Sequence, residues 1–243
     1  MGSVQIELGH HTFSESDMRK TLYAAPQLLG LGPAAGTHER IARLERVARS
    51  LDGIDPMRAD ADALRPLLAT VWRELTTARD ELAASGLRPA RAEGVVPQLG
   101  RSDGGVAKLP VDRVDVGFAG VVGDSQAARV HHGRPWQALC LWSAEVIAAL
   151  TAGGHPIAPG NAGENVTIRG IDWERMYPGV RLQLGSVLCE VSAYAVPCTK
   201  NARWFADLDF TQIHHSNGPI SRVYATVITP GAVAVGDAAV LEP

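Results

Sequence analysis

The sequence predicts an α+β protein, in which a small helical region precedes a mainly antiparallel, barrel-like β-domain. Two observations carry this prediction. Apolar residues recur at spacings of three and four up to about residue 86, which is the period of an amphipathic helix. From Val106 onward apolar and other residues alternate, as in half-buried strands. The Gly- and Pro-rich stretch near residues 88–105 separates the two patterns. We therefore expect a helical region over 1–88 and a barrel domain over 95–243.

Each expected helix has a start or stop signal. Ser14–Asp17 resembles a capping box that opens the first helix. Residues 37–51 and 62–82 carry the two clearest apolar stripes, followed by Gly53 and Gly86. Arginines and glutamates alternate on the opposite faces, which indicates a solvated surface. A nucleic-acid surface is the alternative, and the interleaved acids weaken it.

Strand patterns dominate the rest of the chain. Leu182 and Leu184 alternate, as do Val187, Cys189 and Val191, and the intervening Gly185-Ser186 predicts a hairpin turn. One helix interrupts the strands, with Ser143 as its expected cap. The sequence lacks the Gly-x-Gly-x-x-Gly, phosphate-binding Gly-x-x-x-x-Gly-Lys and His-Glu-x-x-His motifs, so three common mechanisms are without support.

Composition limits the class of protein. The chain has 243 residues, 46% of them hydrophobic, and a formal net charge of −3, which excludes disorder throughout and gives no sign of global binding to nucleic acid or anionic membranes. No apolar run has the length of a membrane span, and we expect a cytoplasmic protein. The three cysteines fit neither a disulfide framework nor a paired zinc spacing.

Cys198 is the strongest candidate for chemistry. Pro197 fixes the backbone before it, Thr199 offers a hydroxyl, and Lys200 and Arg203 bring positive charge. Nearby cations favour the thiolate, the form that attacks electrophiles and binds soft metals. Cys140 and Cys189 lie in apolar strand patterns and are expected in the core.

Two further clusters contain residues suited to ligand binding. His131 and His132 adjoin a Gly-Arg-Pro turn, and at most one of two adjacent strand residues would reach a shared pocket. Glu164 and Asn165 follow glycines that would let the backbone approach a ligand. Plain turn chemistry is the alternative for both clusters. His214 and His215 are expected in a surface loop.

Taken together, the motifs resemble the MOSC family, the domain named after the C-terminus of molybdenum cofactor sulfurase. The resemblance spans about residues 95–243 and leaves 1–86 without a recognised family. Its elements are Gly-Val-x-Lys-x-Pro-Val, Gly-Asp, His-His-Gly-x-Pro, Gly-Glu-Asn-Val-Thr, Pro-Cys, Arg-Val-Tyr-Ala and a closing Pro-Gly-x-Val-x-x-Gly-Asp. Two departures stand out: Tyr194-Ala195-Val196 lacks the arginine that small bacterial reductase members carry there, and Arg134 replaces a glycine.

The resemblance implies a β-rich, barrel-like module with one important cysteine, which falls on Cys198. In the oxidoreductase branch this thiolate is a ligand of molybdenum held by a pterin dithiolene, and the enzyme reduces N-oxygenated small molecules. Cys198, His132 and Asn165 are then the expected catalytic residues. The expected cofactor-binding residues are Lys108, Asp124, His131, Arg134, Gly163, Glu164, Thr199, Lys200, Arg203 and Arg222.

The resemblance leaves two other functions open. In a sulfurtransferase, Cys198 would carry a persulfide or act as nucleophile, and pyridoxal phosphate would belong only to a separate sulfur-donor protein. In a non-enzymatic carrier, the chain would hand the pterin onward. An enzyme of either kind needs an external electron or sulfur donor, because the sequence shows no flavin, haem or iron–sulfur motif. The helical region is expected to cap or dimerise the barrel, to dock the donor, or to cover the pocket.

Overall fold

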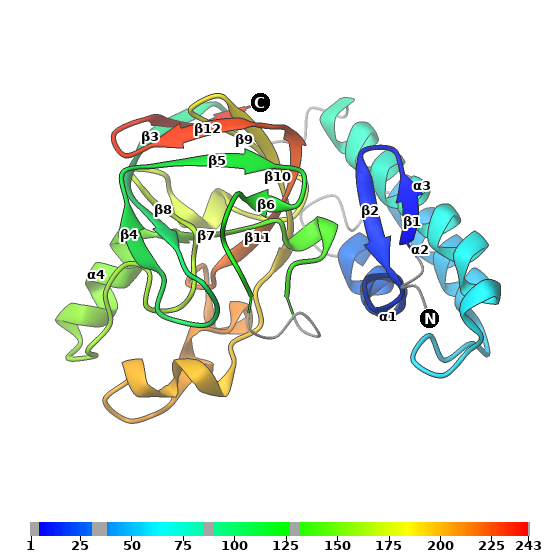
Figure 1. Ribbon diagram of the computed structural model, residues 1–243, viewed down its shortest axis with the longest axis horizontal. Helices are drawn as coiled ribbons and strands as arrows, with labels where there is room; N and C mark the ends of the chain where they lie inside the picture. Colours follow the sequence, from blue (N-terminus) through cyan, green and yellow to red (C-terminus); the bar gives the residue numbers. More distant parts are fainter. Residues whose placement is uncertain (1–4, 31–37, 85–89, 127–131, 243) are drawn as a thin grey trace. The chain divides into compact units, whose positions relative to one another are not determined.

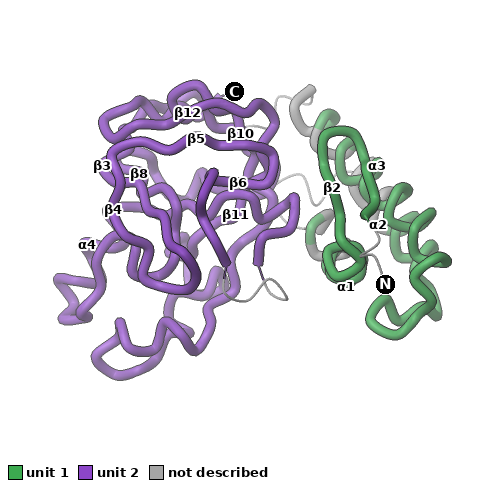
Figure 2. Tube along the Cα trace, viewed as in Figure 1, with its two compact units in different colours: residues 1–88 green, residues 89–243 purple. Residues whose placement is uncertain are grey.

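The computed structural model describes residues 5–30, 38–84, 90–126 and 132–242 (Figure 1). The chain forms two compact units, residues 1–88 and residues 89–243 (Figure 2). In its described residues the first unit contains a β-hairpin and three α-helices. The described part of the second contains the remaining strands, one α-helix and several short 3₁₀ helices.

The N-terminal unit begins with a hairpin that the sequence analysis did not predict. Its elements are β1 (Gln5–Leu8), β2 (His11–Ser14), α1 (Glu15–Gly30), α2 (His38–Leu51) and α3 (Ala61–Ala84). Gly9 adopts a φ of +62° in the turn between the two antiparallel strands. The prediction of a helical region over 1–88 was therefore wrong for residues 5–14. A two-residue turn that contains a glycine lets the short segments on either side pair as strands.

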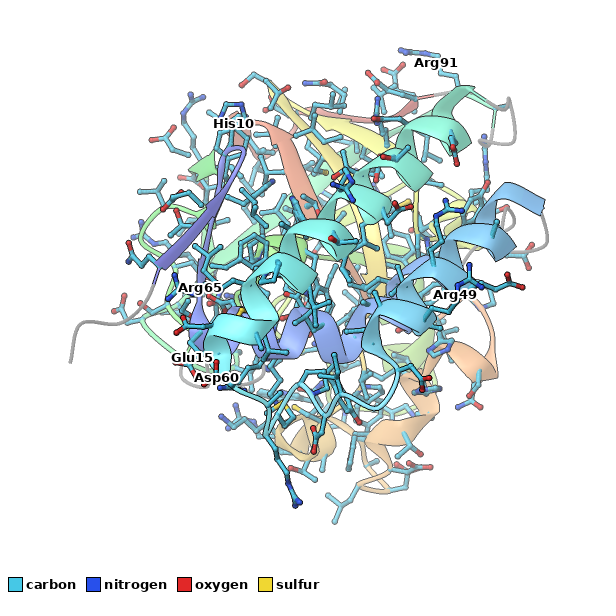
Figure 3. All side chains as sticks on the ribbon, turned by 90° about the vertical axis from the view of Figure 1, so that its right-hand side faces the viewer. His10, Glu15, Arg49, Asp60, Arg65 and Arg91 are labelled. Carbon is cyan, nitrogen blue, oxygen red and sulfur yellow. The ribbon has the colours of Figure 1, made fainter. Side chains whose placement is uncertain are left out.

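The predicted helices of this unit are present. Ser14 and Asp17 form the expected reciprocal cap: Ser14 Oγ accepts from the Asp17 amide at 3.1 Å, and Asp17 Oδ2 accepts from the Ser14 amide at 3.1 Å. The helices share a small core that includes Phe13, Leu22 and Leu68, each fully buried. The labelled Arg49 of α2 faces outward (Figure 3), whereas Asp17 in the first turn of α1 is buried.

The second unit is a seven-stranded, mostly antiparallel barrel (Figure 1). Its strands, in the order in which they pair, are β13 (Ala238–Glu242), β9 (Arg181–Leu184), β10 (Val187–Tyr194), β11 (Val223–Thr229), β7 (Leu139–Ser143), β8 (Val166–Arg169) and β3 (Ala92–Arg101). Pairing of β13 with β3 closes the ring, and β7 and β8 are parallel. Closure removes the exposed strand edges that an open sheet would leave.

Shorter strands complete the unit. β4 (Leu109–Val111) pairs with β3, and β12 (Gly231–Ala234), β5 (Arg113–Gly117) and β6 (Gly120–Val121) form a three-stranded sheet. The predicted hairpin is confirmed, because Leu184 pairs with Val187 across Gly185-Ser186. Val187, Cys189 and Val191 are all buried, as their alternation predicted.

The predicted helix within the strand region is α4 (Ala144–Ala152). Ser143 caps it, and its Oγ accepts from the amides of Glu145 and Val146. In the part of the chain that the structure describes, no helix is both long and apolar enough to cross a membrane.

Candidate functional site

A pocket in the barrel unit collects residues from several of the sequence motifs. Cys140 comes from β7, Tyr224 from β11, and Arg222 from the residue just before β11. Cys198 and Asn201 come from the turn that follows β10. Segments about 80 residues apart in sequence therefore meet here because β11 pairs with both β7 and β10.

Cys198 is partly exposed, unlike the other two cysteines, which are buried. It precedes the 3₁₀ helix η4 (Thr199–Trp204) and has an extended backbone, with φ −129° and ψ 159°. The Asn201 amide donates to the Cys198 carbonyl at 2.9 Å, which fixes the turn after the cysteine. A thiol at this position is accessible from the pocket and held on a defined backbone.

Arg222 is a buried cation that lines the pocket. Its side chain is only 5% exposed, and its Nη1 donates to the carbonyl of Ala162. Among the described residues its Nε has no hydrogen-bond partner. Burying a guanidinium is costly unless its donors are satisfied, so Nε leaves a donor for a polar or anionic ligand or for a bound water.

The second thiol in the pocket, Cys140, differs chemically from Cys198. It is 6% exposed, and its burial raises its pKa to about 11. Cys140 is therefore a neutral thiol at physiological pH. It can line the pocket and pack against a ligand, but it is a poor nucleophile in this state.

A hydrogen-bonded pair forms another part of the wall. Tyr224 Oη lies 3.2 Å from His132 Nδ1, and both side chains line the pocket. Burial raises the pKa of Tyr224 above its ordinary value, so the phenol keeps its proton at neutral pH. The pair can hold a proton next to the pocket that Cys198 lines.

Lys108 and Asp124 neutralise each other. Lys108 Nζ donates to both carboxylate oxygens of Asp124, at 2.6 and 2.5 Å, and the two side chains are 7% and 4% exposed. Asp124 also accepts from the Ser102 amide at 2.9 Å and from Asn165 Nδ2 at 3.1 Å. This network ties the loop before β4 to the loop after β6, and the charge of Lys108 is already compensated.

Glu164 is buried behind the pocket. Its Oε1 accepts from the Gly160 amide at 2.5 Å, and its burial raises its pKa to about 7. Gly160 and Gly163 have φ values of +85° and +91°, which favour glycine. A Cβ at Gly160 would lie 2.5 Å from the Lys108 carbonyl, and a Cβ at Gly163 2.8 Å from Val106. These glycines thus let two loops of the protein pack closely. The sequence analysis had assigned them only to close approach of the backbone to a ligand.

The structure brings part of the predicted site together. The predicted residues that line the pocket are Lys108, His132, Gly163, Asn165, Cys198, Lys200 and Arg222. Five others lie outside its lining: Asp124, Arg134, Glu164, Thr199 and Arg203. His131 lies outside the described residues.

Two of the predicted basic residues bind other groups. Arg134 Nη1 donates to Gln137 Oε1 at 2.5 Å, and the guanidinium lies 5.7 Å from the centre of the Trp136 ring. Arg203 is exposed, lies 4.7 Å from the centre of the Trp204 ring, and donates to the carbonyl of Val106. Neither arginine lines the pocket, and each is bonded to a residue that does.

The sequence analysis missed several pocket residues. Asn201, Gln137 and Tyr224 line the pocket, and so does Cys140, which was expected only in the core. Asn201 had a usable signal, because it follows Cys198 by three residues and the intervening Lys200 suggested a short functional loop. Tyr224 belongs to the Arg-Val-Tyr-Ala motif, but the sequence assigned it no role, because only the fold brings it close to His132.

A metal at this site would need ligands beyond the side chains. Among the described residues, no group of three or more His, Cys, Asp or Glu side chains is arranged to hold a metal ion. Cys198 is one soft ligand, and a metal that binds there would take its remaining ligands from a small molecule.

The comparisons with known proteins identify this unit. Residues 128–240 match the family model described as the MOSC domain, so the barrel unit carries a MOSC domain. The uncharacterized protein YflK of Bacillus subtilis (strain 168) is 30% identical over 115 residues, which are 47% of this chain. The chain spans about half the length of that curated relative, 52%.

Solved structures share the fold. A crystal structure of a hypothetical protein has a TM-score of 0.51 and 27% identity, covering 62% of this chain and 69% of that chain. The YuaD protein from Bacillus subtilis has a TM-score of 0.52 and 20% identity, covering 63% of this chain and 97% of that chain. The MOSC domain family is generally associated with binding of the molybdenum cofactor.

Proposed function

We propose that this chain binds the molybdenum cofactor in the barrel pocket, with Cys198 as the protein ligand of the metal, and that it reduces an N-oxygenated small molecule. The observation that carries the proposal is the position of the partly exposed Cys198 in one pocket with a buried arginine and a protonated phenol. The membership of this unit in the MOSC domain family supports the choice of cofactor.

The residues present fit such a group. Cys198 supplies a soft sulfur, Arg222 has an unsatisfied Nε among the described residues, and Lys200 lines the pocket from an exposed position. Arginine and lysine are the side chains that hold phosphate and other oxyanions. The cofactor would supply the two-electron redox chemistry when bound. Lys108 contributes less charge than expected, because Asp124 compensates it.

The chain's own residues would manage the protons. Reduction of an N–OH group to N–H with release of water consumes two electrons and two protons. Tyr224 is a protonated donor at neutral pH, and His132 Nδ1 lies 3.2 Å from its oxygen. Tyr224 can give a proton to the leaving oxygen and recover one from His132, which reaches the pocket itself, and the proton that the nitrogen takes up would come from water.

Electrons have to come from a separate redox protein, because the cofactor in this pocket is the only redox group that the proposal places on the chain.

The reaction is tested with the full chain, made in a host that synthesises the cofactor. Chemically reduced methyl viologen serves as the electron donor, and an aromatic hydroxylamine is compared with its O-methyl ether. We expect viologen oxidation with the hydroxylamine. Equal background rates with and without protein would overturn the proposed reaction.

Sulfur transfer is the second candidate function. A thiolate that can bind a soft metal can equally accept sulfur from a cysteine desulfurase, which holds the pyridoxal phosphate. The second thiol in the same pocket, Cys140, is neutral at physiological pH, so Cys198 is the thiol of the pocket that would take up the sulfur. The candidate predicts that incubation with a desulfurase and cysteine adds the mass of one sulfur atom to the chain. Persistence of the added mass in Cys198→Ser would rule out Cys198 as the carrier.

A further inference from the structure

Asn201 is a buried amide that the protein itself does not satisfy. Its residue has 0% exposure, and it lines the pocket together with Cys198. Among the described residues, neither its Nδ2 nor its Oδ1 has a hydrogen-bond partner. A buried polar group without a partner is destabilising, so such a side chain is expected to take its hydrogen-bond partner from a bound ligand or water.

The local backbone sets Asn201 next to the candidate reactive sulfur. The Asn201 amide donates to the Cys198 carbonyl at 2.9 Å, in the first turn of η4. Cys198 and Asn201 are three residues apart across this turn, and both line the pocket.

The other asparagine in the pocket provides the contrast. Asn165 Oδ1 accepts from the Cys140 amide at 3.2 Å, and its Nδ2 donates to Asp124 at 3.1 Å and to the Gly100 carbonyl at 3.4 Å. Asn165 thus holds strands and loops together. Asn201 has the same functional group in the same pocket with none of these contacts.

A carboxamide presents a donor and an acceptor side by side. Its matching partner is an edge on which an N–H donor adjoins a C=O acceptor, as in a primary amide or a cyclic lactam. A carboxylate offers acceptors only, and an amidinium offers donors only, so each satisfies half of the Asn201 side chain. The unsatisfied Nε of Arg222, in the same pocket, is a further donor for the carbonyl of such a ligand.

We propose that Asn201 binds the lactam or amide edge of the ligand that occupies this pocket. The edge belongs either to the pyrimidine ring of a pterin or to the substrate beside Cys198. The inference extends the proposed function, but pairing of Asn201 with a lactam requires neither the metal nor turnover. The inference about Asn201 can therefore be confirmed or contradicted independently of the proposed function.

The first test measures binding to the full chain without cofactor. The probe is 2-pyridone, a small lactam, and N-methyl-2-pyridone is the matched ligand that lacks the N–H. We expect Asn201→Leu to weaken 2-pyridone binding by about tenfold or more, because the change removes both hydrogen bonds of the amide. We expect the N-methyl compound to lose about tenfold in affinity for the wild-type protein, because it lacks one of the two hydrogen bonds. Equal affinity of wild type and Asn201→Leu for 2-pyridone would overturn the proposal.

Stability provides the second test. Replacing a structural asparagine with leucine lowers the denaturation midpoint, whereas replacing a ligand-binding one does not. Asn201→Leu removes an unsatisfied amide, so the denaturation midpoint of the cofactor-free protein should stay the same or rise. Asn165→Leu breaks three contacts and should lower the midpoint. If Asn201→Leu lowers the midpoint as much as Asn165→Leu does, the amide has a structural role and the inference is wrong.

Protein loaded with cofactor distinguishes the two sources of the edge. If the pterin ring pairs with Asn201, loaded protein no longer binds 2-pyridone, and Asn201→Leu retains less pterin, measured by the fluorescence of its oxidised form. If the substrate pairs with Asn201, loaded protein still binds 2-pyridone and pterin content is unchanged. Binding of 2-pyridone through Asn201 in protein that never takes up pterin would sustain this inference and overturn the proposed function.

Discussion

Tyr224 Oη lies 3.2 Å from His132 Nδ1 in the wall of the pocket that Cys198 lines. The two residues are 92 apart in the sequence and meet because β11 pairs with β7 beside the loop that carries His132. Trp136 packs edge-on against the Tyr224 ring, with ring centres 6.2 Å apart. The phenol is thereby held in one orientation, and its raised pKa keeps it protonated.

Replacing Tyr224 with Phe removes the phenolic proton and keeps the ring. If Tyr224 delivers a proton to the leaving oxygen, kcat should fall by about a hundredfold, at the lower end of the effect of a general acid. Molybdenum content should not change. The measurement is the steady-state rate with reduced viologen, compared with Tyr23→Phe, a change at an exposed tyrosine of the N-terminal unit. A wild-type rate in Tyr224→Phe would remove the phenol from the mechanism.

The Lys108–Asp124 pair is expected to stabilise the loops around the pocket. Lys108→Met leaves the Asp124 carboxylate buried without its counter-charge, which should lower the free energy of unfolding by about 3–5 kcal/mol. Adding Asp124→Asn removes that charge and keeps an acceptor for the Ser102 amide. The double variant should therefore regain about 1–2 kcal/mol of this loss. Denaturant unfolding measures both, and a double variant less stable than Lys108→Met contradicts the account.

Glu164 predicts a specific pH dependence of stability. Burial raises its pKa from 4.5 to about 7, so the folded protein binds a proton on this group more tightly than the unfolded chain does. Its contribution is complete below about pH 4.5 and is lost as the pH rises through about 7. Glu164→Gln has no charge to bury and keeps an acceptor for the Gly160 amide.

The difference in unfolding free energy, wild type minus Glu164→Gln, should therefore fall by roughly 3 kcal/mol between about pH 5 and pH 8. Intrinsic fluorescence during denaturation reports it, because four of the five tryptophans lie in residues 89–243. A difference that is constant across this range would show that Glu164 is already ionised in the folded protein at about pH 5, so that burial does not raise its pKa.

Much of the fold was predictable because local patterns determined it. Alternation found the strands around Cys189, and the Ser14 and Ser143 caps marked the starts of α1 and α4. The hairpin at residues 5–14 was missed because each strand has only four residues, too few for alternation to distinguish it from a helix. Closure of the barrel through β13 and β3 joins both ends of the unit, which no local pattern reveals.

The site was predictable only at the level of residue types. The motif around Cys198 drew attention to the thiol, but the direction of each neighbouring charge depends on tertiary contacts. Lys108 pairs with Asp124, and Arg134 turns to Gln137, so two expected anion contacts are already engaged. Asn201 was not predicted as a site residue, although it follows Cys198 by three residues. It is buried, and its amide is unsatisfied among the described residues.

Molybdenum content tests the central claim most directly. The full chain and its Cys198→Ser and Cys189→Ala variants are purified from a host that makes the cofactor, and metal per chain is measured by mass spectrometry. Cys189 is a buried core thiol outside the pocket, so its replacement controls for loss of a sulfur. A single thiolate ligand predicts about one molybdenum per chain in the wild type and Cys189→Ala, and a large loss in Cys198→Ser. Less than about a tenth of an equivalent in the wild type, or full retention in Cys198→Ser, would contradict the assignment of Cys198 as the metal ligand.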